Sequence, residues 1–120
     1  MTLSVLDERG QTVTENNPII TEHNGTTGDI VILPLTLVNT AHDHYYRNIT
    51  LRVNSIYPVL ADLLIQTDIV PTYLPEKKIH RINPKESIKF NLRTIVQQNT
   101  KEQIVRGISI NADGMRYPLT

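Results

Sequence analysis

Two segments of this chain, residues 28–54 and 83–114, alternate apolar and polar side chains with a period of two. In the second segment the apolar set includes Ile88, Phe90 and Leu92, and a polar residue stands after each of them. Such alternation places the apolar side chains on one face of an extended strand. A slip of one residue would bury the polar set, so the register of such a strand is well specified. The pattern predicts half-buried antiparallel strands.

Turn residues separate the predicted strands at regular intervals. Short strands are also expected at residues 2–6, 18–21, 65–70, 77–81 and 115–119, and turn signals lie at residues 8–10, 24–25, 83–84, 99–100 and 113–114. Each signal contains glycine, asparagine or proline, which start turns or tolerate positive φ. Regular spacing of short strands is typical of a sandwich. We therefore predict an all-β fold, an immunoglobulin-like antiparallel β-sandwich of seven to nine strands, which occupies residues 1–120 as a single domain.

Three features of the sequence bear on the details of this predicted fold. Residues 57–65 form a short apolar run, and its period alone cannot distinguish a strand from one short helix. Pro34 lies inside the first strong strand and lacks an N–H, which predicts a sheet edge or a bulge at that point. Arg106 interrupts the inward row of Ile104 and Ile108, so its guanidinium must lie at a rim or meet a carboxylate.

Length and composition restrict the class of protein. A chain of 120 residues can bury roughly two-thirds of the surface that its unfolded form exposes, so it can fold without disulfides. It has no cysteine, which fits synthesis in a reducing compartment. Asp7 and Glu8 lie near the N-terminus without a long apolar core, so we expect no signal peptide. The apolar runs are far shorter than the ~20 residues of a membrane span, so we expect no membrane contact.

Charge is balanced overall but unevenly distributed. The chain has 12 basic and 12 acidic residues. Residues 1–30 hold five carboxylates against the single Arg9, whereas residues 76–93 hold six basic residues against Glu76 and Glu86. This polarity has two interpretations. It can reflect ordinary solvated faces, or it can provide an acidic and a basic surface that join copies of the chain or dock it on a partner.

The side chains that could carry chemistry form no recognisable catalytic motif. There is no cysteine, no Gly-x-Ser-x-Gly elbow, no phosphate loop and no dinucleotide fingerprint. We therefore predict that the protein is not an enzyme and has no catalytic residues and no cofactor. His42 and His44 flank Asp43 and are weak candidates for a metal site. A polar hairpin loop between two strands accounts better for the same residues.

Charge and aromatic content suggest where a partner would bind. The interface candidates are Lys77, Lys78, Arg81, Lys85, Lys89, Arg93, Tyr45 and Tyr46. Tyrosine brings a large contact area at a small entropic cost, although one ring of the pair can simply cover an end of the sandwich. Basic strands can also follow phosphates, but the stretch lacks aromatic residues for base stacking apart from Phe90, which belongs to the inward row. We therefore expect no nucleic-acid binding.

Two sequence segments carry a family resemblance. Gly28 and the residues after it lead into a strand that ends in Leu-Thr-Leu-Val-Asn-Thr, followed by a loop and Arg-Asn-Ile-Thr-Leu-Arg-Val. In these residues, and in the Ile-Asn-Pro-Lys-Glu-Ser turn at 82–87, the chain resembles bacterial immunoglobulin-like modules of the cell-adhesion-related, CARDB-like type. Lys85 replaces the glycine of that turn, and Ala41 stands where the family often has glycine. The resemblance covers residues 28–114 and implies a fold more than a function.

A cysteine-free sandwich without a signal peptide also resembles the small immunoglobulin-like accessory proteins of tailed bacteriophages. That resemblance implies a non-enzymatic structural protein of the virion, made in the host cytoplasm and serving as a capsid decoration, neck or tail accessory protein. It would dock through sandwich edges or loops on other virion proteins and could form a homo-oligomer. An alternative is a carbohydrate- or cell-surface-binding module of a larger bacterial protein, for which the chain has few aromatic residues. A weaker third possibility is a periplasmic chaperone-like or transport-associated domain.

Overall fold

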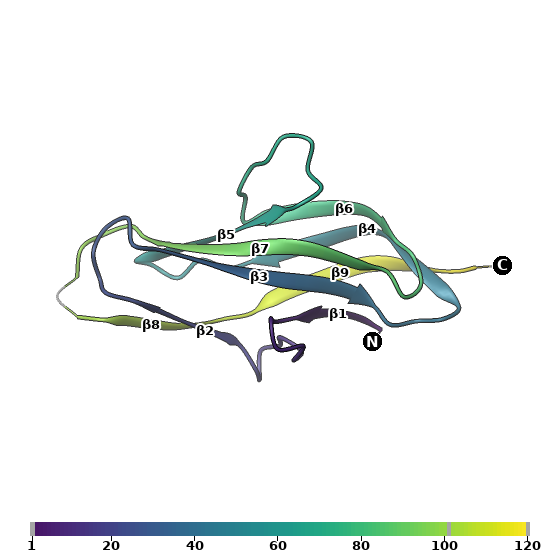
Figure 1. Cartoon of the computed structure of the whole chain (residues 1–120), viewed down its shortest axis with the longest axis horizontal. Helices are drawn as coiled ribbons and strands as arrows, with labels where there is room; N and C mark the ends of the chain where they lie inside the picture. Colours follow the sequence, from purple (N-terminus) through teal and green to yellow (C-terminus); the bar gives the residue numbers. More distant parts are fainter. Residues whose placement is uncertain (1, 101, 120) are drawn as a thin grey trace.

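The computed structural model describes residues 2–100 and 102–119 and contains only strands and loops within them (Figure 1). The nine strands are β1 (Leu3–Leu6), β2 (Ile19–His23), β3 (Ile30–Asn39), β4 (His44–Val53), β5 (Val59–Ile65), β6 (Glu76–Ile82), β7 (Ser87–Val96), β8 (Ile104–Ile108) and β9 (Ile110–Pro118). The prediction of an all-β sandwich is confirmed. Within the described residues, no helix is long and apolar enough to cross a membrane.

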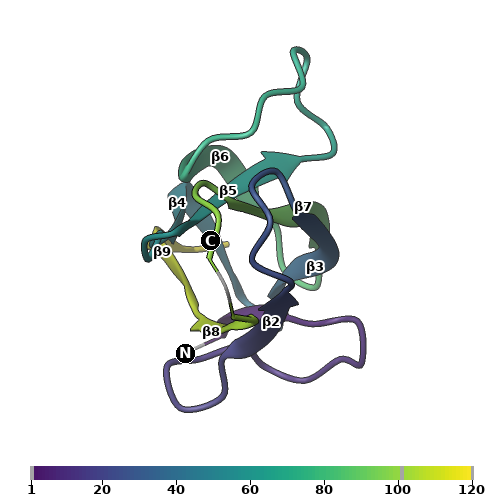
Figure 2. The ribbon, with the colours of Figure 1, turned by 90° about the vertical axis from the view of Figure 1, so that its left-hand side faces the viewer.

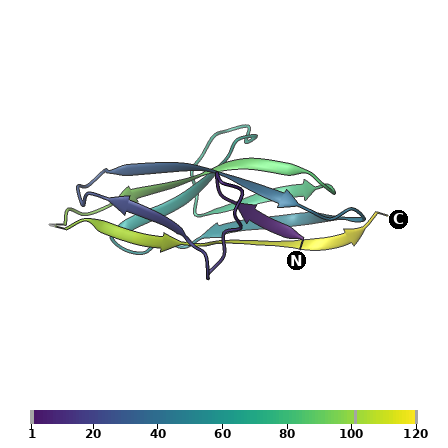
Figure 3. The same cartoon turned by 60° about the horizontal axis from the view of Figure 1, so that its bottom comes forward.

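The strands form two facing layers in an elongated molecule of 57 × 31 × 19 Å. One layer is the antiparallel sheet β1-β3-β7-β5. The other contains the sheet β6-β4-β9 and the pair β2-β8. β8 runs into β9 as one extended segment, so the pair prolongs the second layer (Figure 3). Viewed from the end, the layers enclose a narrow interior (Figure 2).

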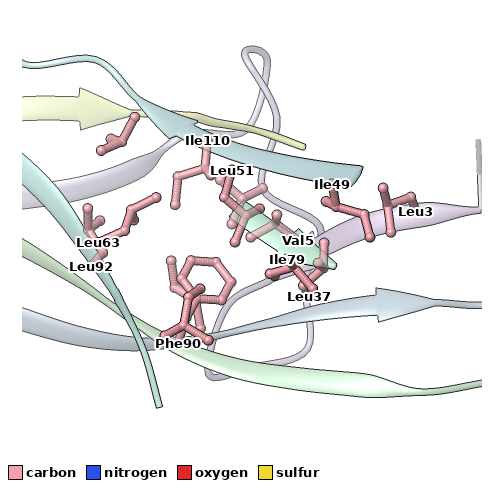
Figure 4. Close-up of a cluster of buried hydrophobic side chains, with 14 of the residues drawn as sticks. Leu3, Val5, Leu37, Ile49, Leu51, Leu63, Ile79, Phe90, Leu92 and Ile110 are labelled. Carbon is pink, nitrogen blue, oxygen red and sulfur yellow. The ribbon is translucent and has the colours of Figure 1, made fainter. Parts of the chain in front are cut away.

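The core lies between the layers and follows the period-two pattern. Phe90 and Leu37 contribute from the first sheet, and Ile49 and Leu51 from the second; all four are fully buried. Figure 4 shows side chains from both layers pointing into this shared interior. Burying a large apolar side chain contributes about 1.5–3 kcal/mol. The inward rows predicted for β3, β4 and β7 therefore form a large part of the core that holds the two layers together.

The structure decides the alternative left open for residues 57–65 and corrects the strand predicted at residues 65–70. No helix forms at 57–65, because Val59–Ile65 is a strand, and no strand forms at 66–70, which belong to a loop. Side chains of β5 do alternate between the two faces. Leu63 points inward, whereas Asp62 pairs with Arg93 on the outer face. The outward Leu60 and Leu64 are apolar too, and this hid the alternation in the sequence.

The turn predicted at residues 113–114 is also wrong, because β9 continues through it. The register of β9 on β4 shifts between Arg47 and Thr50, where Asn48 has a φ of 52°. A Cβ on Gly114 would lie 2.9 Å from Ile49 Cγ1. The glycine therefore permits close approach of β9 to a β-bulge. The predicted turns at 8–10, 24–25 and 83–84 are present as loops with positive φ at Gly10, Gly25 and Lys85.

Pro34 lies at an open edge, as predicted. β1 pairs only with residues 36–39 of β3, so no strand of the described chain pairs with that side of residues 30–35. Arg106 meets no carboxylate in the part of the chain described here. Its Nη1 donates to the carbonyl of Val105, and its Nε is buried without a hydrogen-bond partner.

Candidate functional site

The outer face of the β6-β4-β9 sheet gathers aromatic and basic side chains. β4 is the middle strand; its Tyr45 lies opposite Tyr117 of β9, and its Arg47 lies opposite both Met115 of β9 and Arg81 of β6. Alternation places these five residues on the side away from the core. Cross-strand register therefore joins residues that are far apart in the sequence into one surface.

Four of these side chains stack into what we call the tyrosine–arginine row, Arg81, Tyr45, Tyr117 and Arg47. The Arg81 guanidinium carbon lies 3.8 Å from the Tyr45 ring centroid. The Tyr45 and Tyr117 rings are parallel to within 16°, with centroids 5.4 Å apart, and Arg47 lies 6.0 Å from the Tyr117 centroid. Each exposed cation–π contact contributes about 0.5–1 kcal/mol. The row is pre-ordered and presents ring edges, hydroxyls and guanidinium groups to solvent.

The same face has an excess of positive charge. Arg52 donates to Glu76 at 2.6 Å, and this hydrogen bond lowers the pKa of Glu76 and raises that of Arg52. Lys78 and Asp113 flank Thr50 from opposite strands, and both are exposed. With Arg47 and Arg81, the face has four cations and two carboxylates among the residues named. It suits a partner surface with an acidic character.

The structure divides the predicted interface residues between two sheets and the core. Tyr45, Lys78 and Arg81 lie on the outer face of β6-β4-β9, where Arg81 contacts Tyr45. Lys77 points inward, and its Nζ lies 2.7 Å from Asp68 Oδ2 and donates to the Thr72 carbonyl. Neighbours in a strand face opposite sides, so Lys77 and Lys78 cannot share a surface.

The remaining candidates lie elsewhere. Arg93 donates two hydrogen bonds to Asp62 and covers the Tyr73 ring at 4.0 Å, on the outer face of the other sheet. Lys89 is exposed on that same face, and Lys85 is exposed in the turn before β7. Tyr46 is buried. The tyrosine pair thus splits, one ring on the surface and one in the core.

The two weak metal candidates have different surroundings. His42 is exposed in the loop. His44 is buried; its Nδ1 lies 2.8 Å from Asp43 Oδ1, and its Nε2 lies 2.8 Å from Thr2 Oγ1. The His44 hydrogen bond lowers the pKa of Asp43. Both ring nitrogens are therefore already engaged, and the described residues contain no group of three or more His, Asp or Glu side chains that could hold a metal.

A second buried histidine has similar contacts. His23 Nδ1 lies 3.1 Å from Asp29 Oδ2, and its Nε2 lies 2.9 Å from Thr94 Oγ1. A carboxylate, an imidazole and a hydroxyl in this order resemble the hydrogen bonding of a catalytic triad. Thr94 is fully buried, however, so a substrate cannot reach its hydroxyl. The arrangement satisfies a buried imidazole and ties β2 to β7 across the interior.

The interface candidates taken from the sequence leave out Arg47, Met115 and Tyr117. Arg47 is two residues from Tyr45, so period two could have placed both on one face. Met115 and Tyr117 are also two residues apart, so the same rule could have placed both on one face of the last strand. No local signal in the sequence gave the register of β9 on β4, and this register brings the two pairs together.

Comparisons with known proteins assign no family. No protein-family model matches the sequence, and the search of curated proteins found no match. Among solved structures, the chain is similar to the crystal structure of the CupB6 tip adhesin from Pseudomonas aeruginosa, with 9% sequence identity and a TM-score of 0.43. The similarity covers 85% of this chain and 42% of that chain. A similarity at this level does not transfer the adhesin's role to this protein.

Proposed function

We propose that this protein is a non-enzymatic structural protein that docks on another protein through the outer face of its β6-β4-β9 sheet. The observation that carries the proposal is the tyrosine–arginine row, Arg81, Tyr45, Tyr117 and Arg47. Tyrosine, arginine and methionine are enriched in protein interfaces, and the residues that dominate binding energy are most often tryptophan, tyrosine and arginine. Met115, which is 54% exposed, extends the same surface.

The geometry of the row favours a protein partner over a sugar. Sugar rings stack on open aromatic faces. Arg81 and Tyr117 come from strands on opposite sides of β4, so both faces of Tyr45 are covered. Ring edges and hydroxyl groups remain available, and these suit hydrogen bonding to a protein surface. The carbohydrate-binding alternative therefore gains no support from these two tyrosines.

We extend the proposal to the assembly expected from the sequence. In this view the partner is another protein of a tailed-phage virion, such as a capsid, neck or tail protein. The support is the sequence's resemblance to small phage accessory proteins, together with a positively charged docking face that suits an acidic particle surface.

The first test of the assembly is composition. Purified particles from the native source are analysed by quantitative mass spectrometry, and a protein cross-linked to this chain is identified and purified. The proposal expects the chain in a fixed ratio to virion proteins. Its absence from the particles, or recovery of the chain with envelope glycans instead, would overturn the virion assignment.

The second test addresses the docking face. Binding of the purified partner is measured by calorimetry for the wild type and for the double variant Arg47→Glu/Arg81→Glu. We expect the double variant to lose at least about 10-fold in affinity, as for typical hot-spot positions. Lys89→Glu is the matched control, because Lys89 is an exposed cation on the opposite sheet. Equal affinities for wild type and double variant would contradict the assigned face.

A further inference from the structure

The loop of residues 66–75, between β5 and β6, projects from the body of the molecule (Figures 1 and 2). At its tip, Ile69 is 99% exposed and Val70 is 73% exposed. Isolated exposed apolar residues are ordinary on protein surfaces. Two adjacent β-branched side chains at the tip of a projecting loop instead form a small apolar patch. We call residues 69 and 70 the loop tip.

Contacts at its base fix the loop in this projecting position. Lys77 lies 2.7 Å from Asp68 and donates to the Thr72 carbonyl at 2.8 Å. Leu74 exchanges two backbone hydrogen bonds with Leu63 of β5. Tyr73 packs under the Arg93 guanidinium. A loop held in this way loses less conformational entropy when it binds than a free one.

A groove of about 460 Å³ lies on the opposite edge of the sandwich. The loop of residues 7–18 forms one side and β3 forms the other, with Val13, Pro18, Ile20 and Leu33 among the lining residues. β5 and β6 are the end strands on the side of the loop tip, whereas β1 is the end strand on the side of the groove. Figure 2 shows the loop of residues 66–75 at one extreme of the molecule and the segment of residues 7–18 toward the other.

Two properties of the groove would suit it to an apolar loop. Ile20, at its wall, is 59% exposed, and the adjacent edge of β3 at residues 30–35 pairs with no described strand. The groove therefore offers apolar side chains, together with backbone groups that can hydrogen-bond an extended loop. The combination fits an apolar tip carried on an irregular backbone.

Charge favours the same pairing between copies. Near the groove, residues 7–22 hold four carboxylates against the single Arg9. On the side of the loop tip, Asp68 is paired with Lys77 and Glu76 with Arg52, which leaves Lys78 of β6 without a carboxylate at ion-pair distance in the described residues. The two edges of one molecule are thus opposite in charge, and each presents exposed apolar side chains.

We propose that the loop tip of one copy inserts into the groove of a second copy. Because tip and groove lie on opposite edges, the contact is heterologous, and repetition would build an open row of molecules or a ring. The contact is small, so we expect weak association that strengthens with concentration and weakens with salt. This self-association uses surfaces apart from the tyrosine–arginine row, so either proposal can fail without the other.

The test uses two complementary variants of the full chain, studied by sedimentation velocity over a concentration series. Ile69→Asp removes the tip, and Ile20→Asp places a charge in the groove; both side chains are exposed, so folding, checked by circular dichroism, is expected to survive. Each variant alone should sediment as a monomer where the wild type forms larger species. Mixed together they should form a dimer and nothing larger, because each retains the surface that the other has lost.

The control is Ile56→Asp, which changes a similarly exposed isoleucine, 52% exposed, away from both surfaces. It should associate as the wild type does. The proposal is overturned if the wild type stays monomeric at millimolar concentration in low salt. It is equally overturned if either variant associates like the wild type, or if the mixed variants do not combine.

Discussion

Both sheets place an arginine over a tyrosine on their outer face, but the two arginines have different surroundings. On the first sheet, Arg93 covers Tyr73 and donates two hydrogen bonds to the nearly buried Asp62. On the second, Arg81 covers Tyr45, and its Nε donates to the amide oxygen of Asn83. The first cation is neutralised and braces a loop, whereas the second keeps its charge available. The residue opposite in register makes the difference, because Arg93 faces the carboxylate of Asp62, whereas Arg81 faces a second cation, Arg47.

Asp62→Ala should strongly reduce the unfolding free energy, because it removes the carboxylate and leaves the Arg93 cation half-buried. Breaking a buried ion pair from one side costs about 3 kcal/mol or more, and the 27% exposure of the Arg93 side chain places the expected loss of unfolding free energy nearer 2 kcal/mol. Urea denaturation measures it. Arg81→Ala, on the other sheet, should cost less than about 1 kcal/mol. Equal losses for the two variants would remove the distinction between the faces.

Gly114→Val should disturb the packing of β9 on β4, which positions the tyrosine–arginine row. The added side chain would meet Ile49 at the bulge, where an ideal Cβ already lies 2.9 Å from Ile49 Cγ1. Overpacking of this kind typically costs about 1–3 kcal/mol. Thermal unfolding checks the stability, and the ring resonances of Tyr45 and Tyr117 report whether the stack moves. A variant as stable as the wild type would show that β9 does not need this close approach.

Tyr117→Ala should separate binding from stability. The ring is partly exposed and contributes stacking worth about 0.5–1.5 kcal/mol, so the unfolding free energy should fall by no more than this amount. Affinity for the docking partner should fall about 10-fold or more, because Tyr45 loses its neighbour in the row. Calorimetry and denaturation on the same protein samples supply both numbers. A stability loss without an affinity loss would make the row a structural element only.

The smallest effect concerns the Arg52–Glu76 pair. Because Arg52 lowers the pKa of Glu76 in the folded state, the pair favours folding above the ordinary carboxyl pKa. That contribution is lost as the pH falls through the lowered pKa. An NMR titration should find the Glu76 midpoint below its usual value, and Arg52→Ala should raise it. An unchanged midpoint in the variant would show that the hydrogen bond at 2.6 Å is not held in solution.

Sequence reasoning identified the layers of this fold better than its surfaces. Alternation around Phe90 and around Leu51 was enough to place the core, because inward and outward residues differ in polarity there. In β5 the outward Leu60 and Leu64 are apolar as well, so the same rule left helix and strand open. Alternation along the sequence therefore identifies a strand only where the two faces of that strand have different environments.

Only part of the candidate site could be predicted from the sequence, and the physical reason is different. Lys77 and Lys78 are adjacent, as are Tyr45 and Tyr46, and one member of each pair must face inward in a strand. That much follows from the sequence. The meeting of Tyr45 with Tyr117 and Arg81 depends on the registers of three strands, which are set by long-range packing and by the bulge at Asn48.

Hydroxyl-radical footprinting of the free chain and of the chain in its native assembly tests the central claim most directly. The docking face includes Met115 and Tyr117, whose side chains react readily when exposed, and Tyr57, which is 66% exposed, lies outside it. We predict that assembly protects Met115 and Tyr117 from oxidation and leaves Tyr57 as reactive as before. Unchanged oxidation of Met115 and Tyr117 in the assembled state would show that the β6-β4-β9 face is not where this protein binds.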